Sequence, residues 1–115
     1  MITEKRSRTV RPAAVAGMFY PDDPQELESQ LDSFLAQAGN AESPPKAMIV
    51  PHAGYVYSGP VAATAYARLA ANRRKIRRVV LIGPDHRVGF RGIAASSADW
   101  FETPLGRIPV CLLYT

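Results

Sequence analysis

Two histidines, His52 and His86, are the residues of this chain whose placement could do chemistry. They are the only histidines in the sequence, and each follows a short apolar run, at residues 47–50 and 78–82. Neutral imidazoles bind iron, copper, zinc and nickel. Two such ligands at one place could hold a transition metal, although a catalytic site usually has three protein ligands. Taken singly, each histidine is equally well explained as a core or surface residue bonded to a backbone carbonyl.

Three other polar residues stand beside these histidines in the sequence. Asp85 precedes His86 and is a candidate third ligand or a hydrogen-bond acceptor that supports a ligand. Tyr55 and Tyr57 follow His52, and their phenols could donate a proton or a hydrogen bond to a bound substrate. The glycines nearby form neither a Walker loop nor a dinucleotide fingerprint, so a phosphate-binding loop is not indicated.

The segments that must position the histidines are predicted to form a strand, a helix and a second strand. Residues 47–50 and 78–82 are too short and too uniformly apolar for half-exposed strands, so we predict parallel strands buried on both faces. A helix over about 60–71, capped by Ser58 or Gly59, would connect them. Because parallel strands end at one edge of a sheet, both histidines are expected to meet there.

The rest of the chain supplies scaffold. Asp23 followed by Pro24 predicts a helix start with Asp23 as its cap, and Gly39 predicts its end. Residues 92–97 predict a further strand. Residues 100–110 predict a hairpin, whose turn has the sequence Thr103-Pro-Leu-Gly106.

Composition bounds the possible functions. The chain has 115 residues, of which 47% are hydrophobic and 21% charged, and a formal charge of +4; these values predict one globular domain or part of one. The basic residues have no aromatics between them, so no nucleic-acid partner is expected. One cysteine, Cys111, rules out an internal disulfide. No apolar run has the length of a membrane span, and the expected location is cytoplasmic.

Four motifs together resemble the Memo family, whose bacterial and archaeal members are called AmmeMemoRadiSam system protein B. They are Val15-Ala-Gly-Met-Phe-Tyr-Pro21, Val50-Pro-His-Ala-Gly-Tyr-Val-Tyr-Ser-Gly59, Leu81-Ile-Gly-Pro-Asp-His86 and the hairpin turn. The resemblance covers about residues 10–110. Members of the family are much longer, so residues 10–115 are interpreted as the amino-terminal part of a single Memo-type α/β domain, preceded by a flexible tail at 1–9.

The resemblance carries further expectations about fold and chemistry. It implies an α/β fold with a parallel-core sheet flanked by helices, similar to the class III extradiol dioxygenases and incomplete at its carboxyl terminus. It also implies that His52 and His86 bind iron or copper, with a third protein ligand that this chain lacks, and that the chemistry is redox or dioxygenase-related. AMMECR-type and radical-SAM proteins are implied as partners. Two alternatives stay open: a protein- or peptide-binding module using the same cleft, and a truncated fragment without function.

Overall fold

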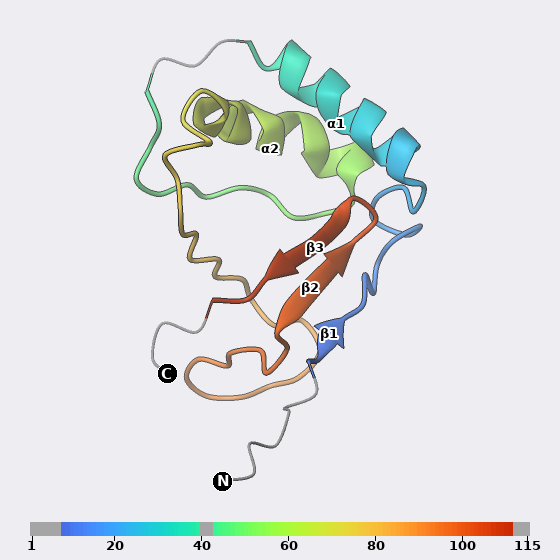
Figure 1. Cartoon of the computed structure of the whole chain (residues 1–115), viewed down its shortest axis with the longest axis vertical. Helices are drawn as coiled ribbons and strands as arrows, with labels where there is room; N and C mark the ends of the chain where they lie inside the picture. Colours follow the sequence, from blue (N-terminus) through green and yellow to red (C-terminus); the bar gives the residue numbers. More distant parts are fainter. Residues whose placement is uncertain (1–7, 40–42, 112–115) are drawn as a thin grey trace, which may run out of the picture.

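The computed structural model describes residues 8–39 and 43–111. Two helices pack against each other, and a small three-stranded sheet lies beside them (Figure 1). In chain order the elements are β1 (Val10–Arg11), α1 (Pro24–Gln37), α2 (Tyr55–Ala70), β2 (Trp100–Thr103) and β3 (Gly106–Pro109). The predicted α/β class is therefore confirmed at this coarse level. Neither helix within the described ranges is long and apolar enough to cross a membrane.

Helix α1 begins and ends where its local signals predict. The Asp23 side chain accepts a hydrogen bond of 2.9 Å from the backbone N–H of Glu26, which satisfies one of the free N–H groups of the first turn. Pro24 occupies the first helical position, where its missing N–H costs nothing. Gly39, with φ of +78°, follows the last turn in the left-handed conformation that commonly ends a helix. Leu27 points into the small core, with 3% of its surface exposed.

Helix α2 starts five residues earlier than predicted, at Tyr55 rather than near Pro60. Its N-cap is Gly54, whose carbonyl accepts hydrogen bonds from the N–H groups of Tyr57 and Ser58. A proline commonly marks the first helical position, and that signal misled the prediction. Inside the helix Pro60 removes the bond to the Val56 carbonyl. Val56 lies on an exposed part of the helix, where water can replace the lost donor.

Helix α1 contacts α2 closely at Gly59. A β-carbon added there would clash with the Phe34 ring of α1, contacting Cε2 and lying 2.8 Å from Cδ2 and 3.0 Å from Cζ. The absence of a side chain at Gly59 therefore lets the aromatic ring of α1 rest directly on α2.

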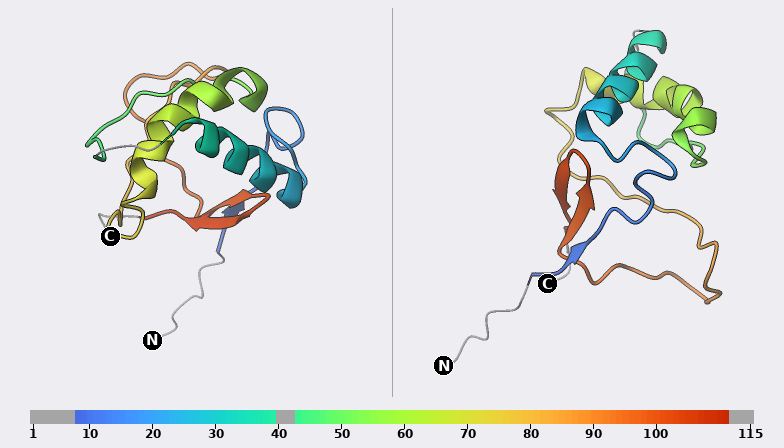
Figure 2. Two further views of the ribbon diagram at one scale, coloured as in Figure 1. Left: turned by 90° about the horizontal axis from the view of Figure 1, so that it is seen from above. Right: turned by 90° about the vertical axis from the view of Figure 1, so that its right-hand side faces the viewer.

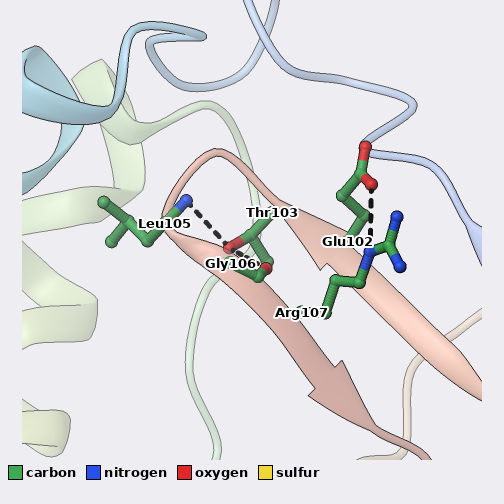
Figure 3. Close-up of polar contacts among 5 residues, drawn as sticks. All are labelled: Glu102, Thr103, Leu105, Gly106 and Arg107. Atoms are coloured by element: carbon green, nitrogen blue, oxygen red, sulfur yellow. Dashed lines mark hydrogen bonds and ion pairs between the residues drawn. The ribbon is translucent and has the colours of Figure 1, made fainter.

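The sheet is mixed and has the order β1-β2-β3. Strand β2 pairs with β1 in parallel and with β3 in antiparallel register. The predicted hairpin and its turn are confirmed: the Thr103 hydroxyl donates to the Gly106 carbonyl and accepts from the N–H of Leu105 (Figure 3). Arg107 and Glu102 face each other across the two strands, with 3.5 Å between Nε and Oε2. The two-residue turn thereby fixes the strand register.

The predicted parallel core is the main error. Residues 47–50, 78–82 and 92–97 form no strand, and the sheet contains none of them. The side chains at 79–82 are 76–86% exposed. A strand is stabilised by neighbouring strands and by layers on its faces, and the described residues place no neighbouring strand beside these runs. The predicted strand–helix–strand unit accordingly does not form.

Little of the chain is buried. Within residues 8–39 and 43–111 only Leu27, Ala63 and Ser58 are buried, and each keeps 3–6% of its surface exposed. Each exposed valine, leucine or isoleucine forgoes about 1.5–3 kcal/mol of burial free energy. The described residues therefore leave many large apolar side chains in contact with water, among them Ile49, Ile93 and the run at 79–82.

Candidate metal-binding site

The turn that carries His52 is tied to the first turn of α2. Ser58 is 6% exposed, and its hydroxyl oxygen accepts a hydrogen bond of 2.8 Å from the N–H of Ala53. The Tyr55 N–H donates to the carbonyl of Phe19 over 2.7 Å, which anchors the start of α2 to the segment before α1. Two residues that follow His52, Ala53 and Tyr55, are thus held by hydrogen bonds from their N–H groups. Ser58 was expected as a helix cap, but it braces this turn from inside the helix.

The turn that carries His86 is organised by Asp85. Its Oδ1 accepts hydrogen bonds from the N–H groups of Arg87, at 2.7 Å, and Val88, at 2.8 Å. These two bonds, to Val88 first and to Arg87 second, hold the pKa of the Asp85 carboxyl below its ordinary value. Since both donors stabilise the ionised form, the turn is formed best with Asp85 charged.

The two turns bring the imidazoles of His52 and His86 together. Their Nε2 atoms are 3.0 Å apart. The ring centroids are 5.3 Å apart and the ring planes are inclined by 32°. Both side chains are exposed, so solvent or an ion can reach the pair. The residues meet although 34 positions separate them in sequence.

The convergence was expected from a sheet edge, and that reason is wrong. The histidines follow irregular segments and not strands, and the sheet of β1, β2 and β3 contains neither. The pair lies instead beside the amino-terminal end of α2, where the Ala53–Ser58 bond fixes one of the two turns. Local hydrogen bonds, and not the ends of parallel strands, hold the turns that bring the two histidines together.

A cavity of about 680 Å³ opens next to the histidine pair. Its walls are mainly apolar and come from α1, from α2 and from the segments that lead to each histidine. They include the aromatic rings of Phe19, Tyr20, Phe34, Tyr55 and Tyr66 as well as Val50, Leu81, Ile82 and both histidines. The imidazoles thus border a space large enough for a small organic molecule.

The two candidate tyrosines, Tyr55 and Tyr57, differ in their position relative to the cavity. Tyr55 lines the cavity, and its ring lies 5.4 Å from that of Tyr20. Burial raises its pKa, with smaller contributions from Tyr20 and Tyr66, so the phenol stays protonated and can donate. Tyr57 is 82% exposed and is not part of the cavity wall. The structure therefore favours Tyr55 over Tyr57 as a substrate-facing residue.

No third ligand accompanies the histidines in the part of the chain that the structure describes. No group of three His, Cys, Asp or Glu side chains gathers there. Asp85 is used by its own turn, and Cys111 is a free, exposed thiol. The pair by itself therefore supplies two ligands.

The sequence did not predict two features of the site. Ser58 braces the His52 turn, and Phe34 forms part of the cavity wall from a different helix. Phe34 was expected only as part of the apolar stripe of its helix. The Gly59 that follows Ser58 was the available signal, because a glycine in a helix can mark the close approach of another element.

Comparison with known proteins extends this description. Residues 11–112 match the family model for Memo-like protein. A MEMO1 family protein of Aquifex aeolicus is 41% identical over 101 residues, covering 88% of this chain and 36% of that protein. Protein MEMO1 of Xenopus tropicalis is 41% identical over 95 residues, with 83% and 31% covered. The yeast MEMO1 family protein MHO1 is 39% identical over 106 residues, with 89% and 31% covered.

The matched region holds every candidate site residue named above, and the chain spans about a third of the length of these relatives. A match of this extent and identity, over residues that include the histidine pair and the wall of its cavity, establishes that the chain belongs to the Memo-like protein family.

Proposed function

We propose that this protein binds a transition metal, iron or copper, through the Nε2 atoms of His52 and His86. The observation that carries the proposal is the 3.0 Å separation of these atoms. In the neutral state one ring can donate an N–H and the other accept it. A metal ion would be held by the same two Nε2 atoms in place of this hydrogen bond.

The separation allows both nitrogens to bind one ion. Metal–nitrogen bonds are about 2.0–2.1 Å long, so an ion could lie within bonding distance of two Nε2 atoms that are 3.0 Å apart. His52 and His86 would then hold the ion together, and its remaining ligands would come from other groups.

The finer part of the proposal concerns redox or dioxygenase-related chemistry. The likeness to class III extradiol dioxygenases that the Memo resemblance implies motivates it, and the mainly apolar cavity beside the pair supports it. A bound iron or copper would supply redox chemistry there. The apolar wall would hold the hydrocarbon part of an oxygen-bearing substrate, and the protonated phenol of Tyr55 would orient it by donating a hydrogen bond to its oxygen. AMMECR-type and radical-SAM proteins belong to this proposal as partners by family association.

Metal binding tests the proposal directly. The purified chain is titrated anaerobically with ferrous or cuprous ion and compared with His52→Ala, His86→Ala and the double variant. Gln37→Ala, at an exposed position of α1, serves as the matched control. We expect each single variant to weaken binding at least tenfold and X-ray absorption of the loaded protein to show two imidazoles. Equal binding by the double variant would reject both residues as ligands.

The cavity itself favours a second candidate, a binding module for an apolar ligand or peptide that needs no metal. Its volume and aromatic walls are those of a small-molecule site. A ligand that binds with unchanged affinity after chelator treatment, and equally to the His52→Ala variant, would support this function over the first. Circular dichroism and light scattering of the isolated chain would show whether it is instead an unfolded or aggregated fragment.

A further inference from the structure

A second cavity, of about 410 Å³, is lined by the hairpin turn and by α1. Both views of Figure 2 place this turn, at the joined ends of the orange and red strands, against the beginning of α1. Leu27 and Leu31 of α1 contribute to its wall, and so does Leu105 of the turn. The hairpin turn is one of the four motifs found in the sequence, and it has no part in the metal site.

This second cavity shares a wall with the larger cavity beside the histidines. Tyr20, Leu31 and Tyr55 line both cavities, so these three side chains lie where one cavity borders the other. The ring centroids of Tyr20 and Tyr55 are 5.4 Å apart, and the ring planes are inclined by 42°. Aromatic rings therefore separate the space beside the histidines from the space beside the hairpin.

The ring of Tyr20 is held in this border by its own backbone and by its neighbour. The Gly17 N–H donates a hydrogen bond of 2.7 Å to the Tyr20 carbonyl, and Pro21 restricts the backbone of Tyr20 to extended conformations. The ring that it contacts belongs to Tyr55, whose N–H is bound to the Phe19 carbonyl at 2.7 Å. The border between the cavities is therefore a fixed wall.

We propose that the ring of Tyr20 closes the larger cavity on the hairpin side and thereby sets the length of the hydrocarbon chain that the cavity accepts. The ligand class is an unbranched molecule with one oxygen-bearing end and a hydrocarbon chain. Its oxygen accepts a hydrogen bond from the Tyr55 phenol, and its chain lies along the apolar wall as far as Tyr20. The proposal rests on the proposed function in one respect, that the larger cavity is a ligand site.

The test finds the longest 1-alkanol whose whole chain the cavity accepts. Alkanols from butanol to dodecanol displace the fluorescent probe N-phenyl-1-naphthylamine from the chain in the presence of chelator, so that no metal is needed. In the parent the affinity should rise about fourfold with each added CH₂ and then stop rising when the alkyl chain reaches Tyr20. In Tyr20→Ala this limit should move to longer alkanols, because the second cavity becomes continuous with the first. Tyr57→Ala is the matched control, since Tyr57 lines neither cavity, and it should keep the parental limit.

Three further variants make the test specific. Tyr20→Leu keeps an apolar side chain in the border and should retain the circular dichroism of the parent while still moving the limit. Leu105→Trp, combined with Tyr20→Ala, fills the second cavity and should return the limit to shorter alkanols. Tyr55→Phe should weaken all alkanols by the same factor and leave the limit in place. A limit that is unchanged in both Tyr20 variants, or that stays long with Leu105→Trp, would overturn the proposal alone. Failure of every alkanol to displace the probe from the parent would also overturn the ligand site on which it rests.

Discussion

The contact between Gly59 and Phe34 allows a substitution whose effect changes sign with its background. Gly59→Ala adds a β-carbon that clashes with the Phe34 ring. Overpacking typically costs about 1–3 kcal/mol. The ring also borders the 680 Å³ cavity, into which it can swing, so we expect the lower part of that range, about 1–2 kcal/mol. Replacing a helical glycine by alanine returns about 0.5–1 kcal/mol. The net result should be a destabilisation of about 0–1.5 kcal/mol.

A double-mutant cycle with Phe34→Ala separates the cost of the clash from the gain in helix propensity. With Phe34→Ala already in place the clash partner is gone, so Gly59→Ala should stabilise the chain by about 0.5–1 kcal/mol. The coupling energy between the two positions should be about 1–2 kcal/mol. Urea unfolding followed by the circular dichroism of the helices measures all four corners. Gly89→Ala, where an added β-carbon meets nothing within 4 Å, is the control and should not couple to Phe34. The same change for Gly59→Ala in both backgrounds would refute the packing described here.

Three further outcomes follow from hydrogen bonds and burial. Asp23→Ala removes the acceptor for the Glu26 N–H and should cost about 1 kcal/mol in urea unfolding, whereas Asp23→Ser should cost little. Ser58→Ala removes the hydrogen bond from the Ala53 N–H. It should lower the free energy of unfolding by about 1 kcal/mol and weaken metal binding, and Ser58→Thr should restore both. An unchanged metal affinity in Ser58→Ala would show that this bond does not position His52. Because the pKa of Tyr55 is raised by burial, the unfolded chain loses this proton first as the pH rises. Stability contributed by the neutral phenol should therefore be complete below about pH 10 and decline above it. Tyr55→Phe should lessen this decline, as measured by urea midpoints across pH, and an identical profile would contradict the assigned environment.

Features set by neighbours in the sequence could be predicted, and features set by distant partners could not. The start of α1 depends on Asp23 and Pro24, and the hairpin turn depends on Thr103 and Gly106, all within a few positions of one another. The apolar run at 79–82 has the composition of a strand but lacks a neighbour to pair with, and strand pairing is a property of two segments. The amino-acid composition of a segment therefore cannot show whether a second strand is present to pair with it.

The beginning of α2 shows a different kind of failure. Pro60 is a common first residue of a helix, but the bonds from the Tyr57 and Ser58 N–H groups to the Gly54 carbonyl start the helix earlier. Tyr55 is further anchored by its bond to Phe19, a contact with a segment 36 positions away. A tertiary contact therefore decided a boundary that the local signal placed elsewhere.

The candidate metal site and several exposed apolar side chains, Ile49 and the run at 79–82, belong to the same two segments, and this has an energetic consequence. Residues 47–50 lead into the turn of His52, and residues 79–82 lead into the turn of His86. At present the two imidazoles are positioned by the bonds of Ser58 and Asp85 to nearby N–H groups, while the preceding segments are unpaired. An ion held by both imidazoles would join the two turns, so it should slow amide exchange in both of them. Linkage requires the reverse as well: a change that orders both turns must strengthen binding of the ion by the same factor.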